Sequence, residues 1–184
     1  MPGLIETTKD SVWAEEAITP SVDRKFATYK KAFSLRERLT NWRPVPSPSL
    51  SFASSRNLLF HAHSYRAAAL LYLHRLLEPP GITETADQKA LEMAYEVLMH
   101  LSAMTDQLKT ALWPVLIAGT EVMEEEDRRV VRGMFDVIIG HRKTVSARRT
   151  KEFCVNRVWK ARDKRVGWNW MDLVEIWPGE CLPI

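Results

Sequence analysis

The spacing of apolar residues constrains this fold more than any other feature, because it follows the period of an α-helix and nowhere the alternation of a strand. Residues 54–78, which end at Pro79-Pro80-Gly81, are apolar on nearly every side and indicate a central buried helix. Residues 83–105 have apolar positions at i, i+3, i+4 and i+7. Further helical patterns cover 23–42, 124–140, 144–165 and 169–177. The sequence therefore predicts an all-α fold, a multi-helix bundle of antiparallel helical hairpins with about six to seven helices.

Polar and proline-rich segments set the expected boundaries. Residues 1–20 are polar and are expected to form a flexible N-terminal segment. A single, partial helical domain is expected over 21–178, followed by a short tail over 179–184. Within the domain, the Pro/Ser-rich stretch 43–53 predicts an extended connector, because its prolines lack the backbone donors that a helix needs.

The stretch ALWPVLIAGTEVMEEEDRRVV (111–131) predicts a corner between two helices. Proline suits a first helical turn, so Trp113-Pro114 begins a helix that should continue through residues 115–123. Gly119 inside that helix costs about 1 kcal/mol relative to Ala, and we expect a neighbouring helix to approach closely there. The four acids at 124–127 complement the positive end of the next helix dipole. That explanation is favoured over a catalytic carboxylate pair, which would need a desolvated or paired carboxyl.

The segment 141–165 contains ten Lys/Arg residues and two acids. One interpretation is a nucleic-acid surface that contacts phosphates. The favoured alternative is a solvated helix face that pairs with the acids of 124–127. Phe153 lies well off the apolar stripe of this helix, and the sequence offers no reason for its position. The candidate basic surface consists of Arg148, Arg149, Lys151, Arg157, Lys160 and Arg162.

Composition narrows the function classes. The chain has 184 residues, a net charge of +3 and two cysteines, which suit one domain with reduced thiols in an intracellular protein. His61 and His63 are two residues apart, so on a helix they point to different faces and do not predict a metal site. No nucleophile elbow, phosphate-binding loop or membrane span is recognisable. Four of the seven tryptophans lie at 159–177, which predicts a packed subcore or, alternatively, a pocket lined by Trp and Leu side chains for a small apolar molecule.

Five blocks occur together in an order that resembles a known family. Together they resemble the C-terminal half of the fungal-specific transcription factor regulatory domain, over roughly residues 24–176. The most specific block is W-P-x-x-x-A-G with the following E/D-x-R helix. The family-motif positions are Trp113, Pro114, Gly119, Glu121, Arg128 and Trp159. The blocks are RERLTNWRPVPSPS (36–49), HSYRAAALLYLHRLL (63–77), LWPVLIAGTEVMEEEDRRVV (112–131), CVNRVWKARD (154–163) and GWNWMDLV (167–174).

The resemblance implies a non-enzymatic, all-helical regulatory domain of a nuclear regulator of RNA polymerase II transcription. Family members read DNA through a separate N-terminal zinc cluster held by cysteines. Because this sequence has only Cys154 and Cys181, we expect neither zinc nor another cofactor here, and no sequence-specific DNA contact. The implied partners are proteins, including related regulators in homo- or heterodimers, and small-molecule effectors. No membrane partner is expected.

Overall fold

A computed structural model describes residues 19–104 and 108–179. Residues 1–18, most of the segment expected to be flexible, lie outside the described residues, and so do 180–184, which include Cys181. Within the described ranges every regular element is a helix, so the predicted all-α class is confirmed. The described helices also agree with the predicted bundle of helical hairpins.

The chain divides into two compact units, with the boundary between Arg38 and Leu39. The first unit contains most of α1 (Thr19–Asn41). This helix begins inside the segment that was expected to be flexible, because Pro20 occupies a first turn where no backbone donor is needed. Phe33 of α1 is half exposed, and the guanidinium carbon of Arg36 lies 4.6 Å from the centre of its ring.

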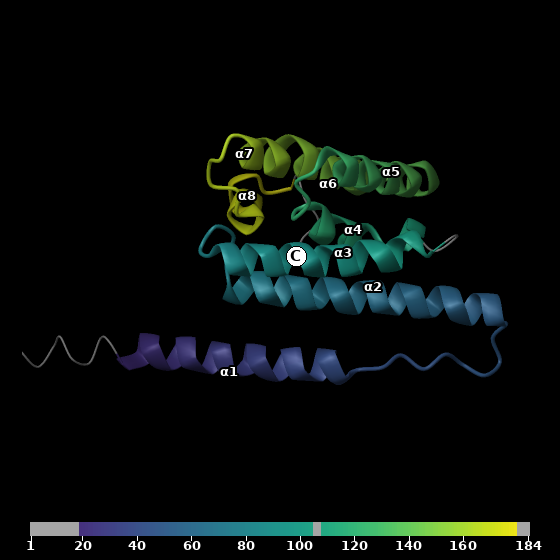
Figure 1. Ribbon diagram of the computed structural model, residues 1–184, viewed down its shortest axis with the longest axis horizontal. Helices are drawn as coiled ribbons and strands as arrows, with labels where there is room; N and C mark the ends of the chain where they lie inside the picture. Colours follow the sequence, from purple (N-terminus) through teal and green to yellow (C-terminus); the bar gives the residue numbers. More distant parts are fainter. Residues whose placement is uncertain (1–18, 105–107, 180–184) are drawn as a thin grey trace, which may run out of the picture. The chain divides into compact units, whose positions relative to one another are not determined.

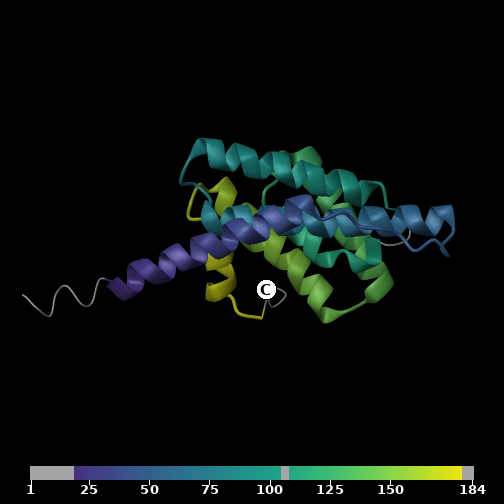
Figure 2. The ribbon, with the colours of Figure 1, turned by 90° about the horizontal axis from the view of Figure 1, so that it is seen from below.

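The second unit starts with a helical hairpin of α2 (Phe52–Leu77) and α3 (Glu84–Ser102). Its short connection makes the two helices antiparallel neighbours, and both views show them side by side (Figure 1, Figure 2). The Ser51 side chain accepts a hydrogen bond from the Ser54 backbone and Thr83 caps α3 in the same way. Because Ser51 is the cap, α2 starts at Phe52, inside the connector predicted for 43–53.

The predicted corner is present, but its first helix is shorter than expected. A single 3-10 turn, η1 (Leu108–Thr110), leads into α4 (Leu112–Gly119), which ends four residues before the expected Met123. The Thr120 hydroxyl donates to the carbonyl of Ile117 at 2.8 Å, and the chain then turns away from the helix axis. The next helix, α5 (Glu125–Arg142), has its acids in the first turn as predicted.

The predicted helix over 144–165 contains a π-helical segment. It consists of α6 (Val145–Phe153), a π turn η2 (Cys154–Trp159) and α7 (Lys160–Asp163). A wider π turn absorbs one residue, and so rotates the following helix by about 100° relative to an uninterrupted α-helix. That rotation explains Phe153, which is fully buried although it lies off the apolar stripe of an ideal helix. The last helix is α8 (Trp170–Ile176).

The core of the second unit forms around α4. Residues 114–119 are all buried, and α4 lies between the α2–α3 hairpin and the layer of α5 and α6 (Figure 1). Small residues on the facing helices, such as Ala68 of α2 and Ala90 and Ala94 of α3, are completely buried and let the backbones approach. From the other side, Val131, Phe135 and Ile138 of α5 close the core. The end of α4 is thereby placed at the meeting point of four helices.

Candidate functional site

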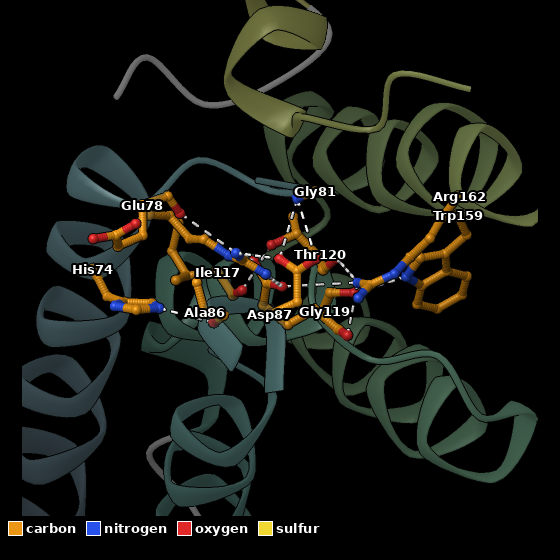
Figure 3. Close-up of polar contacts among 12 residues, drawn as sticks. His74, Glu78, Gly81, Ala86, Asp87, Ile117, Gly119, Thr120, Trp159 and Arg162 are labelled. Atoms are coloured by element: carbon orange, nitrogen blue, oxygen red, sulfur yellow. Dashed lines mark hydrogen bonds and ion pairs between the residues drawn. The ribbon is translucent and has the colours of Figure 1, made fainter. Parts of the chain in front are cut away.

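The C-terminal end of α4 presents backbone carbonyls that have no partner within the helix. These carbonyls accept hydrogen bonds from Trp159, the last residue of the π turn, and from Arg162 of α7. The indole Nε1 of Trp159 donates to the Gly119 carbonyl at 2.7 Å. Nη1 of Arg162 donates to the carbonyls of Thr120 at 2.8 Å and Glu121 at 2.7 Å. Figure 3 shows Trp159 and Arg162 reaching Gly119 and Thr120 from the same side.

Just beyond the end of α4, the Glu121 side chain contacts two arginines. Arg75 of α2 donates from Nε to Oε1 at 2.9 Å and from Nη2 to Oε2 at 2.7 Å, which is the bidentate geometry that a guanidinium favours. Arg162 Nη1 lies 3.8 Å from Oε2 of the same carboxylate. Glu121 and Arg75 have no exposed surface, and Arg162 is 8% exposed.

Asp87 of α3 completes the group. Its Oδ1 accepts from Nη1 of Arg75 at 2.6 Å, and both of its oxygens accept from the backbone of Gly81 in the α2–α3 connection. Nearby, Nε2 of His74 lies 3.0 Å from the carbonyl of Ala86, so the hairpin is joined a second time (Figure 3). We call Arg75, Asp87, Glu121 and Arg162 the buried charge cluster.

Trp168 covers the buried charge cluster from the loop before α8. The guanidinium carbon of Arg162 lies 3.8 Å from the centre of its ring, and that of Arg75 lies 5.4 Å away. An indole ring attracts cations electrostatically and excludes water. Trp168 therefore contacts both guanidinium groups of the buried charge cluster.

The two arginines of the buried charge cluster have pKa values that are shifted in opposite directions. Burial alone lowers the pKa of Arg75, but the hydrogen bonds and charges of Glu121 and Asp87 outweigh it and raise that pKa. Burial lowers the pKa of Arg162, which Glu121 only partly offsets. An arginine stays protonated under these conditions. With two guanidinium and two carboxylate groups, the buried charge cluster has a formal charge of zero.

The family-motif residues lie along α4 and around its end. Pro114 is buried in the first turn of α4, and Trp113 stacks on Tyr65 of α2 with ring centres 5.9 Å apart. Arg128 of α5 donates to both carboxylate oxygens of Asp163, at 2.7 and 3.1 Å. Its guanidinium carbon also lies 5.2 Å from the Trp159 ring centre, and its partnership lowers the pKa of Asp163. The motif thus joins α4 to α2, α5 and the helix after the π turn.

Gly119 lets α4 pack closely against α5 and the π turn. A Cβ atom there would lie 2.9 Å from Cγ1 of Val131 and 3.2 Å from Sγ of Cys154. Only glycine fits that space without displacing a neighbour. The close approach expected at Gly119 is confirmed.

The candidate basic surface is only partly a surface. Arg148, Arg149 and Lys160 are exposed, and Lys151 and Arg157 are half-buried. Arg162 is instead part of the buried charge cluster, so its assignment to the basic surface is wrong. The sequence could not show this because Thr120 and Glu121, whose carbonyls hold Arg162, are about 40 residues away along the chain.

The acids of 124–127 have other partners than the basic segment. Glu126 pairs with Arg129 and Glu125 with Arg132, all within α5. Asp127 accepts a hydrogen bond from the Tyr95 hydroxyl at 2.7 Å, which raises the pKa of Tyr95 to about 12. Lys151 of the basic segment pairs with Asp136, further along α5, at 2.6 Å. The predicted pairing of Lys151 with the acids of 124–127 was therefore wrong, because Lys151 of α6 reaches α5 beyond the first turn of α5.

Sequence reasoning missed Arg75 and Asp87, and it gave Trp168 no role beyond the tryptophan cluster at 159–177. The available signal was Arg75 itself, the one Asp, Glu, Lys or Arg among residues 67–77, the most apolar part of α2. A buried arginine requires an acidic partner, and Glu121 directly follows an apolar run. The sequence contains both residues but gives no measure of the distance between them.

Two cavities beside the π turn have charged side chains in their walls. One of about 440 Å³ is bordered by Arg149, Glu152, Asn156 and Arg157, and another of about 300 Å³ by Arg132, Arg148 and Val155. Trp159 and Trp170 are buried in the core, so they contribute to the predicted subcore. A pocket for an apolar effector stays a prediction. Among the described residues, no group of three His, Cys, Asp or Glu side chains is placed to hold a metal ion.

No described helix combines the length and the apolar character that a membrane span requires. No curated protein and no solved structure matches the sequence. A family model described as the fungal specific transcription factor domain matches residues 9–178, which is most of the chain. This match includes every motif residue around α4, and it is consistent with the nuclear, zinc-cluster regulators that the motif predicted. The chain belongs to the family of fungal-specific transcription factor domains.

Proposed function

We propose that this chain is a non-catalytic regulatory module of a nuclear transcription regulator, and that it acts on RNA polymerase II transcription by contacting other proteins. Membership of the family supports a role in transcription regulation. The proposed partners include related regulators of the same family. Small-molecule effectors remain a prediction from the family resemblance.

The observation that carries this proposal is the complete burial of Glu121. This acid of the motif binds Arg75 in bidentate geometry and has no exposed surface. A general acid or base must come within hydrogen-bond reach of a substrate. Glu121 instead uses its oxygens to join α2 to α4, so the motif favours a structural role that fixes the outer surfaces for partner binding.

A reporter experiment tests the proposal. The chain is fused to a DNA-binding module of known specificity, and reporter transcription is compared with that of the module alone. We expect the fusion to raise or lower transcription, and Glu121→Ala to reduce the effect because it disturbs the core. Glu126→Ala, which removes an exposed acid of α5, is the matched control and should leave the effect intact. A nuclear, folded fusion that leaves transcription unchanged on several promoters would overturn the proposal.

A further inference from the structure

Two adjacent depressions run along the face of α6 and the π turn. The larger holds about 440 Å³ and the smaller about 300 Å³, and they share Glu152 and Asn156 in their walls. We call them together the basic groove. Its cationic side chains are Arg132, Arg148, Arg149, Lys151 and Arg157.

The basic groove keeps a positive balance because Arg148 and Arg149 outnumber Glu152, the acid that lines both depressions. Arg132 pairs with Glu125, and Lys151 pairs with Asp136. Arg149 donates to the carbonyl of Gly179 at 3.4 Å. Because a carbonyl oxygen has no net charge, this contact does not neutralise the guanidinium group. Arg148 is exposed and has no ionic partner among the described residues.

The walls of the basic groove also include apolar and neutral polar groups. Ile139 of α5 and Val155 of the π turn line the smaller depression. Asn156 borders both depressions, and its amide can donate to and accept from a polypeptide backbone. A ligand that fits this wall therefore combines anionic groups with aliphatic ones.

The π turn contributes three of the residues that border the basic groove. Val155, Asn156 and Arg157 all lie within it, next to Arg149 and Glu152 of the preceding α-helical turns. π turns are rare and occur frequently at functional sites. The buried charge cluster contributes nothing to the groove surface, so these residues have no part in the role proposed for Glu121.

We infer that the basic groove binds an acidic segment of a partner protein in which carboxylates are interspersed with aliphatic side chains. Arginine forks recognise carboxylates, and clusters of them bind acidic motifs. Alternating acidic and hydrophobic residues are typical of activation segments. This inference rests on the proposed function, because it names the chemistry of the protein partner.

A nucleic acid fits the same surface less well. Glu152 lines both depressions and Asp136 lies beside Lys151, so carboxylates would face a phosphate backbone. Phosphates also make no use of the aliphatic wall formed by Ile139 and Val155. Both features are compatible with a polypeptide of mixed acidic and aliphatic character.

The test uses the full chain and a short synthetic peptide that alternates Glu or Asp with Leu. Fluorescence anisotropy should show saturable binding that weakens between about 50 mM and about 200 mM salt. Replacing the acids by their amides should abolish binding, and replacing the leucines by serine should weaken it. Arg148→Glu should weaken binding by about tenfold or more, as expected for the loss of a charge-assisted contact. Lys164→Glu, an exposed reversal in the same basic segment that does not line the groove, should bind as the unmodified chain does.

Four outcomes would overturn the inference. They are no binding of the acidic peptide, equal binding of the serine peptide, stronger binding of duplex DNA, and self-association that Arg148→Glu abolishes. Circular dichroism of each variant shows whether it is folded. If the peptide fails while the reporter fusion still changes transcription, the inference fails and the proposed function stands. If the peptide binds and the fusion has no effect, the proposed function fails.

Discussion

At the scale of the residue, Gly119 and Glu121 show why the motif is conspicuous in the sequence. Each meets a condition that few other residues satisfy. Gly119 admits Val131 and Cys154 into the space where a side chain would be, and Glu121 offers two oxygens to buried guanidinium groups. The close packing at Gly119 could be predicted from the sequence, because this glycine lies inside an apolar helical run. The role of Glu121 could not, since Arg75 lies in a distant segment.

Adding one methyl group at two helical glycines should change stability in opposite directions. Gly119→Ala should lower the free energy of unfolding by about 1–3 kcal/mol, because its Cβ would overlap Val131 in a packed core. Gly133→Ala is the matched control, since a Cβ there meets nothing within 4 Å and removes the helix cost of glycine. It should raise stability by up to about 1 kcal/mol. Urea denaturation of both variants measures the difference, and equal stabilisation would contradict the close-packing account.

Removing the Glu121 side chain should be strongly destabilising. Glu121→Ala leaves Arg75 buried with only one of its two carboxylates, and we expect a loss of about 3–5 kcal/mol. Arg75→Met combined with Glu121→Leu removes both charges of the pair and should cost less than Glu121→Ala alone. Glu126→Ala, which breaks an exposed pair in α5, should change stability by about 0.5 kcal/mol or less. Denaturant titrations of the four chains test this, and a double variant that is no better than Glu121→Ala would argue against buried charge as the cause.

At the scale of the element, helix positions follow from the apolar period and the breakers. The sequence placed a helix at 54–78 where α2 covers Phe52–Leu77, and one at 124–140 where α5 covers Glu125–Arg142. The π turn was missed because α- and π-helical turns use the same residue types. Its signal was Phe153, whose apolar side chain did not fit the stripe. On an ideal α-helix, the residues that are buried before the π turn and those that are buried after it would lie on different faces. The extra residue of the π turn brings them onto the same face.

Shortening the π turn should therefore be tolerated. Deleting exposed Asn156 should convert the segment to regular α-helix and keep Phe153 and Trp159 facing the core, because one residue accounts for about 100° of rotation. The same argument predicts that deleting exposed Gly133 from regular α5 turns half of its buried face to solvent. Thermal denaturation followed by circular dichroism should show a cooperative transition for the first deletion and a largely unfolded second variant. Loss of cooperative unfolding on deleting Asn156 would show that the π turn is required for folding itself.

At the scale of the whole molecule, two histidines of the α2–α3 hairpin, His61 and His100, should make the stability of the second unit depend on pH. His63 of α2 and His100 of α3 stack with ring centres 5.3 Å apart. Burial lowers the pKa of His100, reinforced by His63 and Arg66 and opposed by Glu96. Burial also lowers the pKa of His61. Nδ1 of His100 and Nε2 of His61 are buried without a hydrogen-bond partner, so a proton added there would gain no acceptor.

The free energy of unfolding should consequently fall as the pH drops below about 6.5, the ordinary histidine value. In that window the unfolded chain binds protons that folded His61 and His100 resist, so unfolding takes up protons and acid favours it. Above the window both states are neutral at these rings and the contribution vanishes. His100→Gln should flatten the dependence between about pH 6.5 and pH 5, whereas His141→Gln at the exposed end of α5 should leave it unchanged. Asp163 acts separately, because Arg128 lowers its pKa and its contribution disappears only below the ordinary carboxyl range. Denaturant titrations across this range measure the slope, and a His100→Gln chain with an unaltered slope would place the pH response elsewhere in the fold.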